Sequence, residues 1–117
     1  MITLSDDCFR MYGKVDKNIL PLVKVLNSLK YVRTMGSCGG HANPNKCQQP
    51  KGQWFVSFAC SDDQKLPLVK YVLLKNDVGL TENLGNWFAA RGKTKHLKKI
   101  VAELKQLKKM EMSIWAN

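Results

Sequence analysis

A chain of 117 residues, 44% of them hydrophobic and 24% charged, has the size and composition of one folded domain. No apolar run approaches the roughly 18 residues needed to cross a bilayer, and the N-terminus lacks the basic and apolar segments of a signal peptide. Four cysteines are too few to indicate a disulfide scaffold in a chain of this length. We therefore expect a single domain over residues 1–117, located in the cytoplasm and without a membrane partner.

The first fifteen residues give no clear pattern, and within them residues 8–12 fit either a short strand or one helical turn. The first predicted helix spans residues 18 to about 29. Asp16 or Asn18 is placed to cap this helix, and Pro21 falls in its first turn, where the missing N–H does no harm. Apolar residues recur along it at helical spacing, namely Ile19, Leu22, Val23, Leu26 and Leu29. A strand at residues 31–35 and a long loop over 36–52, rich in glycine and proline, are predicted to follow.

The second half of the chain predicts two strands and two helices. Residues 54–60 are almost continuously apolar, which is typical of a strand covered on both faces near a sheet centre. We expect a helix over residues 64–76 with caps at 61–63, a turn over 77–85 and a strand over 86–90. Thr94 is placed to cap a last helix that ends near residue 111. This order predicts an α/β fold of the two-layer α+β type, with three to four strands packed against about three helices.

The net charge of +10 is concentrated in one segment near the C-terminus. Eight basic residues and one acidic residue, Glu103, lie between Arg91 and Lys109, so this segment carries +7. Clustered charge of this kind is typical of proteins that bind nucleic acid, although a solvated helix face or an acidic protein partner would also account for it. The candidate nucleic-acid-binding residues are Lys95, Lys98, Lys99, Lys105 and Lys109.

The glycine-rich loop holds the second group of candidate site residues, which are Thr34, Ser37, Cys38, Gly40 and His41. Cys38, His41 and Cys47 have spacings that zinc tolerates and are the candidate metal ligands. A fourth ligand is missing, because a straight strand would carry Cys60 roughly 20 Å from the loop and into the core. The sequence also lacks the glutamate and the Pro-Cys-x-x-Cys motif of the zinc deaminases.

Three other interpretations of this loop stay open. Cys38 and His41 could form a nucleophilic thiolate–imidazolium pair. The backbone N–H groups of Gly36, Gly39 and Gly40 could instead form a nest for a phosphate, although the P-loop spacing is absent. The loop could also be only a glycine-rich turn between paired strands, fixed by local hydrogen bonds.

Three aromatic residues of the apolar strand, Trp54, Phe55 and Phe58, could stack on RNA bases. Their place in a continuously apolar run favours core packing instead.

Parts of the chain resemble the tRNA wybutosine-synthesising protein 3 family. The resemblance rests on residues 26–34, on Ser37-Cys38-Gly39-Gly40 and on Lys51-Gly52-Gln53-Trp54. It implies an α/β fold, tRNA as partner and methyl transfer from S-adenosylmethionine, with Ser37, Cys38 and Gly40 as the loop residues that carry over. The chain departs from the family pattern in having Gly36, Gly39 and His41 at neighbouring loop positions.

The loop pattern Thr-x-x-Ser-Cys-x-Gly-His is also similar to one found in small bacterial and phage proteins, and that resemblance implies no particular activity. The residues themselves identify no cofactor and do not decide whether the protein is an enzyme. We therefore expect a nucleic-acid-binding module, with RNA favoured over duplex DNA. The alternatives are a protein-interaction module of mobile-element or phage type and a tRNA-modifying, methyltransferase-like enzyme.

Overall fold

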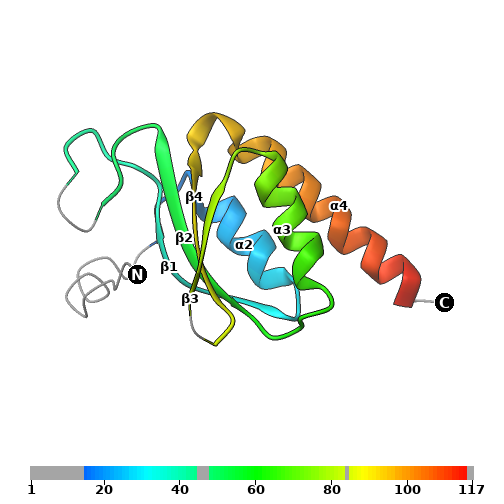
Figure 1. The fold of residues 1–117 in the computed structure, drawn as a ribbon. Coiled ribbons are helices and arrows are strands. Elements are labelled where there is room, and N and C mark those ends of the chain that lie inside the picture. The colour runs from blue at the N-terminus through cyan, green and yellow to red at the C-terminus, as the bar shows by residue number, and fades with distance from the viewer. Residues whose placement is uncertain (1–14, 45–47, 84, 116–117) are drawn as a thin grey trace.

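The computed structural model describes residues 15–44, 48–83 and 85–115, with side chains described as far as residue 111. The elements along the chain are α2 (Leu20–Ser28), β1 (Val32–Cys38), β2 (Gln53–Cys60), α3 (Leu66–Lys75), β3 (Gly79–Asn83), β4 (Trp87–Lys93), the short 3-10 helix η1 (Thr94–His96) and α4 (Leu97–Trp115). Figure 1 shows the sheet as one layer and the three helices α2, α3 and α4 as a second layer on one of its faces. The predicted α+β architecture is thus confirmed.

The four strands form one antiparallel sheet in the order β1-β2-β4-β3. The apolar strand β2 is an inner strand, as its sequence predicts, since it pairs with β1 and β4 and most of its side chains are buried. Side chains alternate between the two faces, so Trp54, Val56 and Phe58 enter the core beneath the helices while Phe55 points to the opposite face. The core interpretation of Trp54 and Phe58 is therefore confirmed.

The helices α2 and α3 begin with the same five residues, Leu-Pro-Leu-Val-Lys, and both have proline in the first turn. The predicted capping of α2 is wrong. Neither Asp16 nor Asn18 caps it by a side chain, because both side chains bond instead to the loop around Gly39. Ahead of α3, the carboxylate of Asp62 accepts hydrogen bonds from the backbone N–H groups of Gln64 and Lys65.

The predicted cap at Thr94 is also wrong. Thr94 lies in η1, ahead of α4, and its hydroxyl is buried with no hydrogen-bond partner among the described residues. The helix α4 itself is longer than expected and extends to Trp115. Its inner face supplies Leu97, Ile100 and Leu104 to the core, as its predicted apolar stripe requires.

Two further differences concern strands. The segment 77–85, expected to be a turn, contains the edge strand β3, whose partner β4 completes its hydrogen bonds. The strand β1 continues through Gly36 to Cys38, three residues past its predicted end, after a register shift between Thr34 and Gly36. The loop therefore begins only at Gly39. The interpretations of residues 8–12 fall outside the described residues.

Candidate functional site

The basic surface of the protein is a groove between α2 and α4. It encloses about 610 Å³, and Leu20, Pro21, Val25 and Ser28 of α2 line it. Lysines from both sides line it, namely Lys17, Lys24, Lys105, Lys108 and Lys109. Among the described residues no acidic side chain lines this groove, and none of the five lysines forms an ion pair. We call this surface the lysine groove.

Helix geometry explains why α4 presents these lysines together. Residues 105 and 109 are one turn apart and share a helix face, and Lys108 lies beside them toward α2. Buried Ile100 and Leu104 fix the rotation of α4 about its axis. The apolar stripe thus determines which lysines face the groove.

The opposite flank of α4 is charge-neutralised against α3. Lys75 forms an ion pair with Glu103, and the side-chain amide of Asn76 donates to Glu103 at 3.2 Å and to the Val72 carbonyl at 2.7 Å. The Lys75 ammonium holds the pKa of Glu103 below its ordinary value, and the Glu103 carboxylate raises the pKa of Lys75. The one acidic residue of the basic segment therefore lies on the flank away from the groove. We call this contact the α3–α4 seam.

The structure divides the five lysines predicted from charge alone. Lys105 and Lys109 line the lysine groove, whereas Lys95, Lys98 and Lys99 are exposed outside it. Lys95 lies in η1, and Lys99 is close enough to Glu103 to help lower the pKa of that carboxyl. Lys17, Lys24 and Lys108 were missed. The first two lie about 80 residues before their α4 counterparts, so no local charge run includes them.

A second hollow adjoins the groove and shares Lys108 and Ser28 with it. Here the Tyr31 hydroxyl donates to Glu111 at 2.6 Å, and burial together with this carboxylate raises the pKa of Tyr31. Glu111 is the first carboxylate met along α4 beyond the groove lysines, and it shares this hollow with Lys30, Lys65 and Lys108.

The loop after β1 is built around the side chain of Asp16, which precedes α2. One carboxylate oxygen, Oδ2, accepts the Gly39 N–H at 2.8 Å and lies 3.2 Å from His41 Nε2. Asn18 donates to the Gly39 carbonyl at 2.7 Å, so the turn before α2 holds both sides of this glycine. Ligand atoms of Asp16, Cys38 and His41 all lie within 4.8 Å of one another.

Backbone bonds across the loop keep this cluster in place. The His41 N–H donates to the Gln49 carbonyl at 2.9 Å, and the Gln49 N–H donates to Cys38 Sγ at 3.2 Å. Gly40 has φ +95°, and a Cβ there would lie 2.5 Å from the Gln53 carbonyl oxygen. This position therefore requires glycine for both its conformation and its close approach to the backbone.

The remaining predicted loop residues lie apart from this cluster. Thr34 exchanges hydrogen bonds with the side chain of Asn27 on α2, at 2.8 and 2.9 Å, and lies roughly 13 Å along the strand from Cys38. Ser37 is in β1 opposite Val56. Cys47, the third predicted metal ligand, lies outside the described residues. Asp16 was not predicted as part of the site, because its sequence position indicates a helix cap.

The structure also bears on the other interpretations of the loop. The Gly39 N–H is donated to a carboxylate, which disfavours a phosphate at the same place. Cys60 is buried in the core, as expected, and burial raises the pKa of its thiol.

Phe55 packs with Cys38 and Ala89 on the helix-free face of the sheet, with the Arg91 guanidinium 5.1 Å from its ring centre. Only 4% of Phe55 is exposed, so it offers no open ring for stacking on a base.

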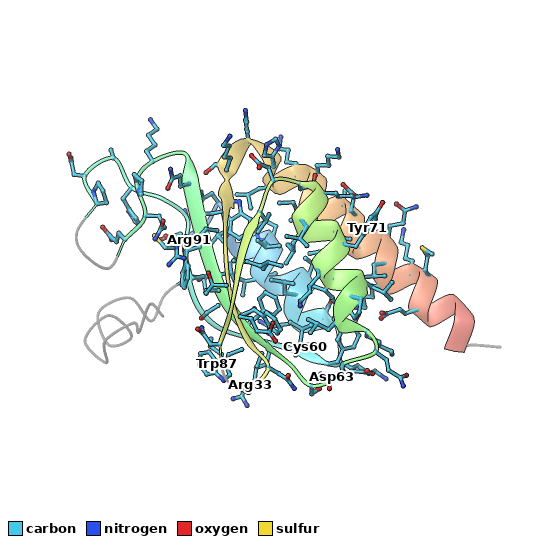
Figure 2. All side chains as sticks on the ribbon, viewed as in Figure 1. Arg33, Cys60, Asp63, Tyr71, Trp87 and Arg91 are labelled. Carbon is cyan, nitrogen blue, oxygen red and sulfur yellow. The ribbon has the colours of Figure 1, made fainter. Side chains whose placement is uncertain are left out.

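One arginine and one tryptophan project from the helix-free face of the sheet. Arg33 and Trp87 lie in one row of the sheet on either side of Ala59 (Figure 2). Both are exposed. They lie on the face of the sheet opposite the helices and therefore do not belong to the lysine groove.

The chain matches no protein-family model, no curated protein and no solved structure. The resemblance to the wybutosine-synthesising family therefore stays an expectation. Among the described residues, no helix combines the length and the apolar character that crossing a bilayer requires.

Proposed function

We propose that this protein is an RNA-binding module and that the lysine groove receives the RNA backbone. The observation that carries the proposal is the convergence of five lysines on one concave surface that no described acidic residue lines, one lysine from the turn before α2, one from α2 and three from α4. Lysine ammonium groups act as point charges toward phosphate, and their clustering supplies affinity without reading bases.

The chemistry of the groove defines how binding should depend on salt. Each neutralised phosphate of a single strand contributes a slope of about −0.7 to the plot of log affinity against log salt, so five lysines give about −3.5. Among the described residues, the lining of the groove contains no arginine, asparagine or glutamine, the side chains that most often recognise base edges. We therefore expect strong salt dependence and weak sequence preference.

The packing of α4 favours RNA over duplex DNA. The major groove of B-DNA is about 12 Å wide and admits a single helix, which itself measures about 10–12 Å across with its side chains. The helix α4 packs against both α2 and α3, so the lysines of its groove flank lie in a hollow beside α2 and not on an isolated helix. A single-stranded or looped RNA can bring successive phosphates into such a hollow.

Fluorescence anisotropy with tRNA, single-stranded RNA and duplex DNA, at low and near-physiological salt, tests the proposal. The Lys105→Glu/Lys109→Glu variant should lose about 100-fold in RNA affinity. The matched control is Lys95→Glu/Lys99→Glu, which makes the same charge change on exposed lysines outside the groove and should lose only a few-fold. Equal losses in both variants, or weak and salt-abolished binding to all three nucleic acids, would show that the charge acts generically and would overturn the proposal.

One observation favours the protein-interaction alternative. Leu68, Tyr71 and Leu74 follow one another at three-residue spacing on α3 and are 45%, 65% and 55% exposed. Tyr71 lies on the helical side of the molecule in Figure 2. Exposed apolar surface of this kind is typical of protein-binding sites. A salt-resistant complex with one protein, weakened by Tyr71→Ser and unaffected by nucleic acid, would support this function in place of the first.

The methyltransferase-like alternative rests on the family resemblance alone. Calorimetric titration with S-adenosylmethionine tests it directly. Saturable binding of one molecule per chain would support that alternative, and no heat of binding would remove it.

A further inference from the structure

The cluster formed by Asp16, Cys38 and His41 lies apart from the lysine groove and takes no part in the proposed binding of RNA. We propose that it is a zinc site, in which the Asp16 carboxylate, the Cys38 thiolate and the His41 imidazole are the three protein ligands. Their ligand atoms lie within 4.8 Å of one another, although the residues come from the turn before α2, the end of β1 and the loop beyond it.

The three donor types fit Zn²⁺. Carboxylate oxygen, thiolate sulfur and imidazole nitrogen are its ordinary protein ligands, with bonds of about 2.0–2.3 Å. In a tetrahedron of such bonds, neighbouring ligand atoms are roughly 3.3–3.8 Å apart. Asp16 Oδ2 and His41 Nε2 are 3.2 Å apart, so this edge is close to its final length. The sulfur lies at most 4.8 Å from the other two ligand atoms, so it would have to move closer to them by no more than roughly 1 Å to bind the same ion.

The groups around the cluster already orient two of the ligands. The Gly39 N–H donates to Asp16 Oδ2 and the Gln49 N–H donates to Cys38 Sγ. Backbone N–H groups in these positions stabilise a carboxylate and a thiolate, which are the forms that bind the metal. Asn18 donates to the Gly39 carbonyl, so the residue whose N–H binds Asp16 is held on its other side as well.

Burial favours a metal ion over a nucleophilic thiol. Cys38 is only 6% exposed, which leaves an external electrophile little access to its sulfur. The side chains of Asp16 and His41 are 34% and 33% exposed, so an ion can enter from their side and a fourth ligand such as water can reach it. This set of three ligands does not include Cys47. Its third member is Asp16, which the sequence did not indicate as a ligand.

The test titrates the metal-stripped, reduced full-length chain with Zn²⁺ by calorimetry and with Co²⁺ by absorption spectroscopy. We expect one ion per chain and, with Co²⁺, a sulfur-to-metal charge-transfer band together with visible bands of tetrahedral type. Cys38→Ser should remove the charge-transfer band. Cys38→Ser, His41→Gln and Asp16→Asn should each weaken Zn²⁺ binding by about 100-fold or more, because even outer-shell partners change metal affinity by about 10- to 100-fold.

The chain supplies matched controls for two of the ligands. Cys60→Ser removes a buried thiol and His96→Gln removes an imidazole, both outside the cluster, and both variants should keep wild-type affinity. Circular dichroism confirms that each variant is folded, and Asp16→Asn, which keeps the side-chain shape, decides the question if Cys38→Ser does not fold. No Co²⁺ charge-transfer band in the wild type, a band that survives in Cys38→Ser, or equal loss in the controls would overturn the zinc site.

Discussion

The two flanks of α4 both carry lysine, but among the described residues its charge is unpaired on one flank and neutralised on the other. Toward α2, three lysines of α4 meet two more lysines and no described carboxylate. Toward α3, Glu103 pairs with Lys75 and accepts a bond from Asn76. Unpaired lysines held near one another repel, and their mutual repulsion is relieved when an anion binds. The comparison shows that position around the helix, rather than the number of lysines in the segment, separates a structural contact from a binding surface.

Leu104→Ala should have the largest effect, because it removes the support shared by both flanks. Leu104 is fully buried beneath α4, so truncation should destabilise the fold by about 2–5 kcal/mol. Urea denaturation measures this loss. Met110→Ala on the same helix is the control, since Met110 is 57% exposed and its truncation should change stability by no more than about 0.5 kcal/mol. Similar stabilities for the two variants would contradict the packing of α4 described above.

The α2 side of the lysine groove provides the next test. Lys17→Glu/Lys24→Glu should lower RNA affinity by about 30- to 100-fold and flatten the salt dependence, because two phosphate contacts become repulsive. Anisotropy titrations across a salt series measure both quantities. Lys51→Glu/Lys95→Glu makes the same charge change on exposed residues that do not line the groove. If this control lost as much affinity, the groove would have no special role.

Asn76→Ala breaks the seam without touching the groove. Asn76 is 4% exposed, and its amide serves both the Val72 carbonyl and the Glu103 carboxylate. Its removal takes one donor from each of these two acceptors, although Glu103 keeps its ion pair with Lys75, and should cost about 1–3 kcal/mol of stability. RNA affinity should be unchanged when it is measured under conditions where the variant is folded. A parallel loss of RNA binding would show that the two flanks are not independent.

Glu103→Gln should have the smallest effect on stability, and this effect should depend on pH. The pKa of Glu103 is lowered in the folded state, mainly by Lys75, so the ion pair stabilises the fold above the ordinary carboxyl pKa. That contribution is lost as the pH falls through the lowered folded-state pKa. The wild type should therefore exceed the variant in Tm at neutral pH, and the two should converge in acid. A difference in Tm that grows on acidification would contradict the assignment. RNA affinity should stay near the wild-type value although the loss of one carboxylate makes the variant's net charge more positive.

Much of the fold could be predicted from the sequence because the helices and β2 depend on local patterns. The apolar stripes of α2, α3 and α4 repeat at helical spacing, and β2 is apolar throughout. The edge strand β3 could not be recognised in this way. Thr81, Glu82 and Asn83 are polar, and they form a strand only because β4 completes their backbone hydrogen bonds. Gly36 similarly looks like the start of a loop but lies within β1, opposite Ser57.

The candidate sites were only partly predictable, because each combines residues that are distant in sequence. Charge density identified Lys105 and Lys109 but could not add Lys17 and Lys24, which reach the groove only through the packing of α2 on α4. Asp16 has the sequence position of a helix cap, and its carboxylate is used instead by a glycine 23 residues later. No spacing rule within one segment could have found that contact.

The turn before α2 belongs to both proposed sites, since the side chain of Asp16 holds the loop and the next residue, Lys17, lines the groove. Zn²⁺ that repositions Asp16 would therefore also shift the backbone of Lys17, which contacts the RNA. Thermodynamic reciprocity then applies: whatever factor Zn²⁺ imposes on RNA affinity, RNA must impose on Zn²⁺ affinity. One short turn would in that case make the RNA-bound fraction of the protein respond to the concentration of available metal.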